Sequence, residues 1–121
     1  MSDWYDREGN KITTADYDTE PDLWMEQMGE VEKKLSDRSY KVLKQENTPE
    51  GKYWISTVWL GLDHSFSGSK PLIFETMVFD RHNGEVDYAS NEMKRYSTEA
   101  AALKGHVRMV KKWTKTEGRE A

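Results

Sequence analysis

The first periodic segment of the chain has the spacing of an α-helix. Thr19 precedes Asp22 by three residues, as in a capping box, and Pro21 suits the first turn because its missing N–H would have no partner there. Four apolar side chains then share one face at intervals of three or four residues: Trp24, Met28, Val31 and Leu35. The pattern predicts a helix that begins near Thr19 and ends near Ser36.

Four segments with the composition of β-strands follow, and short turns separate them. They cover residues 39–47, 52–62, 71–80 and 85–96, the last interrupted around 89–91. Pro49 and Gly51 favour a turn after the first strand, and Asn83-Gly84 is a strong hairpin signal after the third. Because short connections join antiparallel neighbours, these segments predict an antiparallel meander.

The last periodic segment predicts a second long helix. It runs from about Thr98 to Lys115, with Ser97 or Thr98 as its cap and Gly118 as its stop. Its predicted inner face is formed by Leu103, His106, Val107, Val110 and Trp113. We therefore expect an α+β fold, in which a four-stranded antiparallel meander sheet has an N-terminal helix and a C-terminal helix packed on it.

The composition fits one domain of this class. The chain has 121 residues, and we expect residues 1–18 to form an acidic N-terminal arm and residues 19–121 a single α+β domain. Hydrophobic residues make up 36% and charged residues 33%, and no apolar run approaches the ~18 residues of a membrane-spanning helix. The absence of cysteine excludes disulfides and thiolate metal sites. We expect a cytoplasmic protein that needs no cofactor and does not enter a membrane.

The predicted sheet is apolar on both faces. In the second strand, Ile55 and Trp59 point to one face and Trp54 and Val58 to the other, since alternate side chains lie on opposite sides. The final helix can cover one face. The other face needs the first helix, which is the simplest cover, or the N-terminal arm, a second copy of the chain or a partner protein.

Charge is unevenly distributed along the chain. Residues 1–32 contain ten acidic and two basic residues, whereas the remainder contains 12 acidic and 16 basic residues. The two regions can neutralise each other within the fold, or the acidic region can bind a partner. The candidate partner-binding residues are Asp3, Asp6, Asp16, Asp18 and Glu20. A nucleic acid is not favoured as the partner, because the formal net charge of the whole chain is −4.

Residues with acid–base or ligand-binding chemistry occur in the middle of the chain without a recognisable motif. Asp63, His64, Glu75 and His106 are types that acid–base catalysis or metal binding uses, but their spacing matches no metal or catalytic pattern. A structural ion pair is the simpler expectation for Glu75, and we expect neither a metal site nor catalytic residues. The loop after the second strand resembles a phosphate-binding loop in composition, but its glycine spacing is wrong and no helix follows it. Its ligand-binding candidates are Asp63, His64, Phe66, Ser67 and Lys70.

Several stretches resemble a widespread group of small phage and prophage proteins. The longest are WISTVWLGLDHSF at residues 54–66 and PLIFETMVF at residues 71–79. The opening residues 4–9 and the late residues 95–100, followed by Gly105-His106, also fit this group. The resemblance covers the opening and most of residues 53–110, and it implies a phage-related origin but no particular activity.

These observations lead to a primary expectation and two alternatives. We expect a small phage-related accessory protein, not an enzyme, that binds and inhibits a host macromolecule such as a defence complex. The acidic N-terminal region and the aromatic surface of the sheet would make the contact. The first alternative is a binder of a small anionic ligand, such as a nucleotide signal, between the loop and the basic final helix. The second is a small acid–base or metal-dependent hydrolase, and a homodimer is compatible with each.

Overall fold

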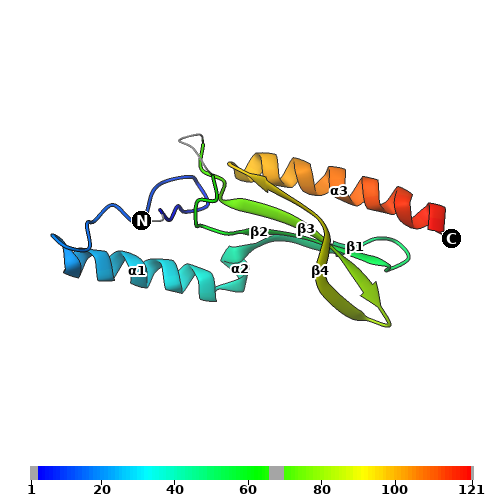
Figure 1. The fold of residues 1–121 in the computed structure, drawn as a ribbon, viewed down its shortest axis with the longest axis horizontal. Helices are drawn as coiled ribbons and strands as arrows, with labels where there is room; N and C mark the ends of the chain where they lie inside the picture. The colour runs from blue at the N-terminus through cyan, green and yellow to red at the C-terminus, as the bar shows by residue number, and fades with distance from the viewer. Residues whose placement is uncertain (1–2, 66–69, 121) are drawn as a thin grey trace.

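The computed structural model describes residues 3–65 and 70–120 and has the α+β architecture expected from the sequence. Its elements, in chain order, are α1 (Pro21–Ser36), α2 (Arg38–Lys41), β1 (Val42–Asn47), β2 (Tyr53–Trp59), β3 (Phe74–His82), β4 (Glu85–Tyr96) and α3 (Glu99–Glu120). The strands form one antiparallel sheet in the order β1-β2-β3-β4. The predicted meander and the two long helices are therefore confirmed (Figure 1).

The turns between the strands follow the local sequence. Asn83 and Gly84 have φ angles of 51° and 81°, the left-handed conformation that a tight two-residue hairpin loop requires. Gly51 has a φ of 77° and closes the turn between β1 and β2, where its N–H donates to the Thr48 carbonyl at 2.9 Å. The fourth strand is not interrupted as predicted, because β4 continues from residue 85 to residue 96. The irregularity appears instead as two shifts in the register between β3 and β4.

The first helix starts differently from the prediction. α1 begins at Pro21 with Glu20 as its N-cap residue, and no side chain caps it, so the predicted capping box at Thr19 is wrong. The Asp16 carboxylate instead accepts hydrogen bonds from the backbone of the preceding turn, including the Thr19 N–H at 3.3 Å. Thr19 is therefore part of that turn and not of the helix.

The segment between α1 and β1 also differs from the prediction. Residues 38–41 form the short helix α2, although the sequence predicted a strand from residue 39. The Asp37 carboxylate accepts from the backbone N–H of Ser39 at 3.0 Å and from its hydroxyl at 2.6 Å, and this is the geometry of a helix N-cap. Local capping thus outweighs the strand propensity of Tyr40 and its neighbours.

α3 covers one face of the sheet and forms the core with it. One cluster contains Tyr53, Ile55, Val78 and Met109, and the other contains Trp59, Ile73, Phe74, Tyr96 and Ala102. Gly105 permits the close approach of α3, because a Cβ at this position would overlap the Tyr96 hydroxyl. The predicted inner face is wrong for Leu103 and Val107, which are 38% and 52% exposed. The helix instead turns its smaller residues, Ala102 and Gly105, toward the sheet.

The C-terminal end of α3 is tied to the turn between β1 and β2. The Glu117 side chain accepts hydrogen bonds from the Thr48 hydroxyl and from the N–H groups of Glu50 and Lys52, the latter two at 2.9 and 3.0 Å. Burial raises the pKa of this carboxyl, but the three hydrogen bonds outweigh burial and hold the pKa of Glu117 below its ordinary value. This anchor explains why the helix continues past Gly118, the predicted stop.

The molecule is elongated, and α1 and the C-terminal end of α3 lie at opposite ends of it (Figure 1). α3 lies along the strands, whereas α1 lies largely beyond one end of the sheet, beside the N-terminal segment. Leu35 at the end of α1 packs against the core cluster of Trp59, and Trp4 forms an isolated bridge with Leu62. α1 is therefore not a layer across the second face of the sheet. None of the helices in the described residues combines the length and hydropathy that crossing a lipid bilayer requires.

Candidate functional site

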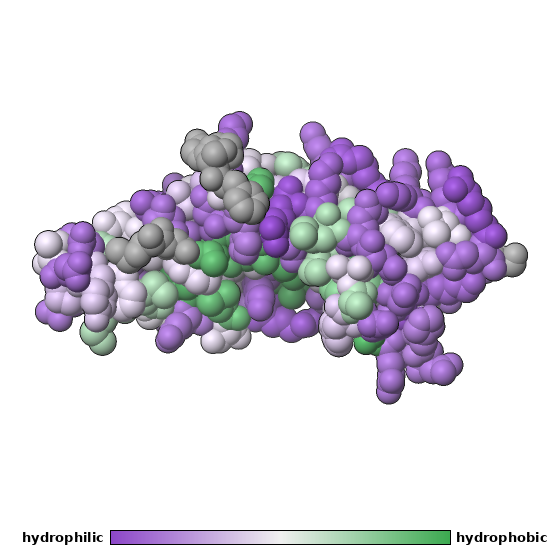
Figure 2. Space-filling model, viewed as in Figure 1, coloured by the Kyte–Doolittle hydropathy of each residue, from purple (hydrophilic) through white to green (hydrophobic). Residues whose placement is uncertain are grey.

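The face of the sheet opposite α3 carries an apolar patch that no helix of the described chain covers. The strand register and ring contacts place five side chains on this side: Trp54, Met77, Phe79, Tyr88 and Met93. Met93 and Tyr88 are 44% and 74% exposed, Trp54 and Met77 are half-buried, and Phe79 is buried among its neighbours. These five residues are called the open face below. On the side shown in Figure 2, apolar surface gathers over the middle of the molecule, where the strands lie.

Three aromatic rings form a row across the open face. The ring centroids of Trp54 and Phe79 are 5.6 Å apart, and those of Phe79 and Tyr88 are also 5.6 Å apart. Because the rings come from β2, β3 and β4, the row crosses the direction of the strands. Such pairs gain about 0.5–1.5 kcal/mol beyond the area that they bury, which favours one arrangement of the rings. The open face thus presents an aromatic surface that is already formed.

The polar groups around the open face are paired with one another. Three hydrogen-bonded pairs join different strands at 2.9 or 3.0 Å: Gln45 with Ser56, Asn47 with Arg81, and Glu75 with Arg95. The sequence indicated that Glu75 needs a cationic partner, and Arg95 is that partner. Since these groups already have hydrogen-bond partners within the sheet, a partner that covers the face leaves them satisfied. Covering the open face therefore leaves none of these three pairs without its hydrogen bond.

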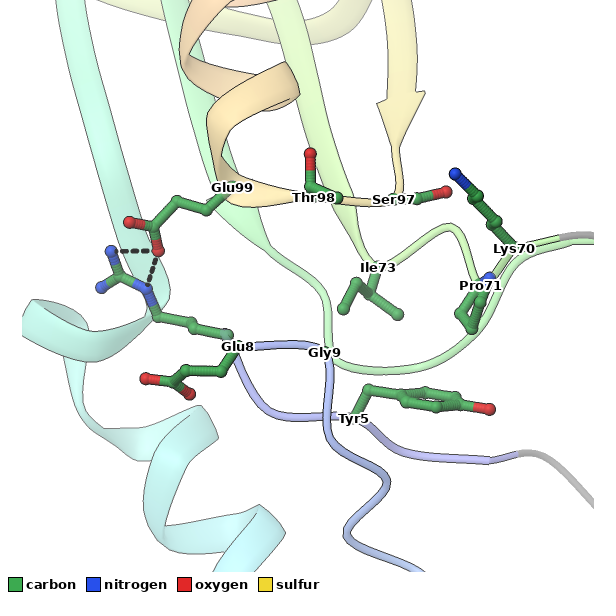
Figure 3. Close-up of a pocket in the computed structure, with 10 residues that line it drawn as sticks. Tyr5, Glu8, Gly9, Lys70, Pro71, Ile73, Ser97, Thr98 and Glu99 are labelled. Carbon is green, nitrogen blue, oxygen red and sulfur yellow. Dashed lines mark hydrogen bonds and ion pairs between the residues drawn. The ribbon is translucent and has the colours of Figure 1, made fainter.

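A cavity of about 540 Å³ lies between the N-terminal segment, residues 70–73 and the start of α3 (Figure 3). Its lining includes Tyr5, Arg7, Lys70, Pro71, Ser97 and Glu99. Arg7 and Glu99 close one side with an ion pair at 2.7 Å, and Lys70 stands on the other side (Figure 3). Among the predicted ligand-binding residues, Lys70 lines this cavity, whereas Phe66 and Ser67 lie outside the described residues. The volume is in the range of small-molecule sites.

The other two predicted ligand-binding residues, Asp63 and His64, hold the base of their own loop. Asp63 accepts from the N–H and hydroxyl of Ser65 at 2.8 and 3.0 Å and from the Leu72 N–H at 3.0 Å. His64 Nδ1 lies 2.8 Å from the Leu62 carbonyl oxygen. Burial raises the pKa of Asp63, but its hydrogen bonds outweigh burial and keep the pKa below the ordinary value. The chemistry of both residues is therefore used within the fold.

The acidic residues predicted to bind a partner differ in how they are used. Asp3 forms an ion pair with Lys11 at 3.3 Å. The carboxylates of Asp6 and Asp16 each accept hydrogen bonds from two backbone N–H groups that follow them in the chain. The side chains of Asp18 and Glu20 are exposed. Asp3, Asp6 and Asp16 thus have local structural roles in the turns before α1.

A chain of polar groups, buried except for Glu46 at its outer end, connects α3 to the covered face of the sheet. His106 Nδ1 lies 2.7 Å from Thr57 Oγ1, and His106 Nε2 lies 2.8 Å from Glu46 Oε1. Thr57 Oγ1 in turn lies 2.6 Å from Thr76 Oγ1. A hydroxyl, an imidazole and a carboxylate in this order resemble a catalytic triad. Thr57 and His106 are fully buried, however, so a substrate has no access to the hydroxyl and the chain is structural.

The structure does not bring together the acid–base residues considered from the sequence. His106 belongs to α3 and faces the sheet, whereas Glu75 lies on the opposite face of the sheet and pairs with Arg95. Asp63 and His64 are held in their loop after β2. Within residues 3–65 and 70–120, no group of three or more carboxylate or imidazole side chains is placed to hold a metal ion. The geometry gives no support to a hydrolase that uses these residues.

The comparisons with known proteins add no relative. A scan against protein-family models and searches of the curated proteins and of the solved structures found no match to this chain. The functional inference therefore rests on the geometry above. Sequence reasoning expected an aromatic sheet surface but did not single out the residues of the open face, although strand alternation already placed Trp54 on the side away from Trp59.

Proposed function

We propose that this chain is a non-catalytic binding protein and that the open face is its docking surface for a partner protein. The observation that carries the proposal is the exposure of Tyr88 and Met93 beside the aromatic row, on a sheet face that no described helix covers. An antiparallel sheet with one face in water normally places polar residues on that face. The open face departs from this pattern, and an exposed apolar patch of this kind marks an interaction site.

The residue types of the open face match the centre of a protein–protein interface. Aromatic residues, methionine and arginine are enriched there, and tryptophan and tyrosine carry much of the binding free energy. The open face has aromatic residues in Trp54 and Tyr88 and methionines in Met77 and Met93. Arg95 lies beside them in β4. Because the charge of Arg95 is neutralised by Glu75, the face favours a partner surface that is apolar and nearly uncharged.

The resemblance to small phage proteins makes a host protein the candidate partner. An accessory protein without an active site acts by occupying a surface that its target needs, and inhibition of the target follows from that occupation. The exposed acids Asp18 and Glu20 lie before α1, at the far end of the molecule from the C-terminal end of α3. At that distance from the aromatic row they would affect the rate of association more than the stability of the complex.

A site-specific cross-linking experiment tests the docking surface. Tyr88→p-benzoylphenylalanine places a photo-reactive group on the open face, and Met25→p-benzoylphenylalanine places the same group on α1, where Met25 is 66% exposed. We expect position 88, and not position 25, to cross-link to one defined host protein.

The cross-linked protein is then purified and titrated with the unmodified chain. We expect Trp54→Ala to weaken the affinity by roughly tenfold or more, as for a central aromatic contact, and Met25→Ala to leave it unchanged. Equal cross-linking from both positions, or equal affinity of Trp54→Ala and the parent chain, would contradict the proposal.

The cavity supports a second candidate function, the binding of a small anionic ligand. Its volume of about 540 Å³ and the single lysine at its rim, Lys70, are the observations that favour this function. A ligand that binds the folded chain raises its melting temperature, so a panel of nucleotides is tested by thermal shift. A shift that Lys70→Ala abolishes supports this candidate, and a flat response across the panel excludes the nucleotides tested.

A further inference from the structure

The outer side of α3 carries a row of cations that the proposed function does not use. Its five members are Arg108, Lys111, Lys112, Lys115 and Arg119, all exposed, and with Thr116 they line a shallow hollow of about 440 Å³. These five residues are called the cationic row below. Their spacing of three or four residues places them on one side of the helix.

The cationic row is not explained by the stability of the helix. Like charges three or four residues apart on a helix repel each other and destabilise it. Among the ion pairs of the described residues, only one involves the row, that of Lys112 with Glu92 at 2.9 Å. Arg119 lies in the last turn, where a cation favours the helix dipole, but Arg108 and Lys111 lie well before it.

The cationic row is also separated from the acidic part of the chain. Its residues lie toward the C-terminal end of α3, whereas α1 and the N-terminal segment lie at the other end of the molecule (Figure 1). α3 has 22 residues and is therefore about 33 Å long. Charges separated by more than the Debye length, about 8 Å at physiological ionic strength, are largely screened from each other. The negative net charge of the whole chain argues against nucleic-acid binding only if the acidic and basic regions act together. At this separation they act independently, so the cationic row is considered by itself.

We propose that the cationic row binds the phosphate backbone of a nucleic acid duplex without reading its sequence. From Arg108 to Arg119 the helix rises about 17 Å, so the row can follow several successive phosphates of one strand. The lining of the hollow contains three types of side chain, arginine, lysine and threonine, and none is aromatic or apolar. In Figure 2 hydrophilic surface predominates at this end of the molecule.

The same chemistry argues against an acidic protein as the ligand. The centre of a protein interface usually contains aromatic or apolar anchors, whereas nucleic-acid interfaces are strongly positive and polar. The Thr116 hydroxyl donates to the Lys112 carbonyl at 3.1 Å, and Lys112 is paired with Glu92, so the other four cations are the contact groups of the hollow. Contacts of this kind position a protein on a duplex but carry no sequence information.

Fluorescence anisotropy with a labelled 20-base-pair DNA duplex tests the proposal on the full chain. If three or four phosphates are neutralised, raising the salt from 50 to 200 mM lowers the association constant by a factor of roughly 40 to 150. The Lys111→Glu/Lys115→Glu variant is expected to weaken binding at 50 mM salt by roughly tenfold or more and to reduce the salt dependence by about two phosphate contacts.

The matched control is Lys33→Glu/Lys41→Glu, which changes the net charge equally at exposed positions on α1 and α2. We expect this control to bind the duplex within about twofold of the parent chain, since charges remote from the contact are screened. Circular dichroism melting of both variants shows that each is folded. Equal loss of binding in the two variants would overturn the proposal, as would the absence of duplex binding at 50 mM salt. Binding to polyglutamate or to phosphatidylserine vesicles in preference to the duplex would overturn it too.

Discussion

Two tryptophans of β2, Trp54 and Trp59, show how the two faces of the sheet differ. Trp59 points toward α3 and is fully buried, with its Nε1 donating to the Tyr5 carbonyl at 3.0 Å and its ring against Tyr40. Trp54 points the other way and is half-buried, and its described ring contact is with Phe79. The same residue type in the same strand is thus part of the core in one case and of a surface in the other.

The polar groups of the two faces differ in the same way. On the covered face, His106 of α3 bonds to Thr57 in the sheet, so the helix and sheet depend on each other. On the open face, Glu75 and Arg95 bond within the sheet and need nothing above it. The polar groups of the covered face thus need α3 as a hydrogen-bond partner. Those of the open face keep their hydrogen bonds whether the face is exposed to water or covered by a partner.

The largest expected effect comes from truncating each tryptophan. Trp59→Ala removes a fully buried side chain and leaves a cavity, so we expect the free energy of unfolding to fall by about 3–5 kcal/mol. Trp54→Ala loses partial burial and one ring contact, and we expect a loss of about 1.5 kcal/mol or less. Urea denaturation followed by circular dichroism measures both variants. Equal losses would mean that the two faces are equally covered.

A smaller effect is expected from the two buried glutamates. Glu117→Ala leaves the N–H groups of Glu50 and Lys52 without their acceptor, and we expect a loss of about 2–3 kcal/mol. Glu75→Ala removes an ion pair from the open face, where Arg95 can turn to water, and we expect a loss of about 1 kcal/mol or less. Urea denaturation measures the loss of stability in both variants. A larger loss for Glu75→Ala than for Glu117→Ala would contradict the difference between the two faces.

The smallest effect concerns the pH dependence of stability. Burial lowers the pKa of His106 below its ordinary value of 6.5, although the hydrogen bond to Glu46 opposes the shift. Below pH 6.5 the unfolded chain therefore binds a proton that the folded chain does not, and the free energy of unfolding falls as the pH decreases toward the lowered pKa. The slope is at most about 1.4 kcal/mol per pH unit.

Urea denaturation at pH 7.5, 6.5 and 5.5 measures this slope. The expected control is His106→Gln, whose amide can still hydrogen-bond to Glu46 and Thr57 but does not titrate, so its stability should change little over this range. The lowered pKa of Glu117 acts in a separate window, because it removes stability only as the pH falls below about 4.5. Identical slopes for the parent chain and His106→Gln would show that His106 is not held neutral.

The sequence predicts the elements of this fold better than their ends. Periodicity and the Asn83-Gly84 turn are local signals, so the meander and both long helices follow from them. The start of α2 depends on the capping geometry of Asp37, and the end of α3 depends on the bonds of Glu117 to a turn more than 60 residues earlier. A long-range contact of this kind leaves no trace in the pattern around Gly118.

The candidate site was predictable only in part. Alternation along β2 and β3 already places apolar side chains on both faces of the sheet, which indicates that something must cover or bind the second face. The side of α3 that faces the sheet includes Gly105, which packs closely against Tyr96, while Leu103 and Val107 point outward, and the spacing of apolar residues alone did not indicate this. The pairing of Glu75 with Arg95 depends on the strand register, which the sequence does not specify.

Hydroxyl-radical oxidation of methionines tests most directly whether the open face is exposed. Met93 is 44% exposed on this face and Met77 is half-buried, whereas Met109, on the side of α3 that faces the sheet, is 6% exposed; Met25 on α1, at 66%, is the reference. In the purified chain at low concentration, mass spectrometry should show Met93 oxidised at a rate near that of Met25. Met77 should react more slowly, and Met109 roughly tenfold or more slowly than Met93. Oxidation of Met77 and Met93 as slow as that of Met109 would show that the second face is covered, and it would contradict the account.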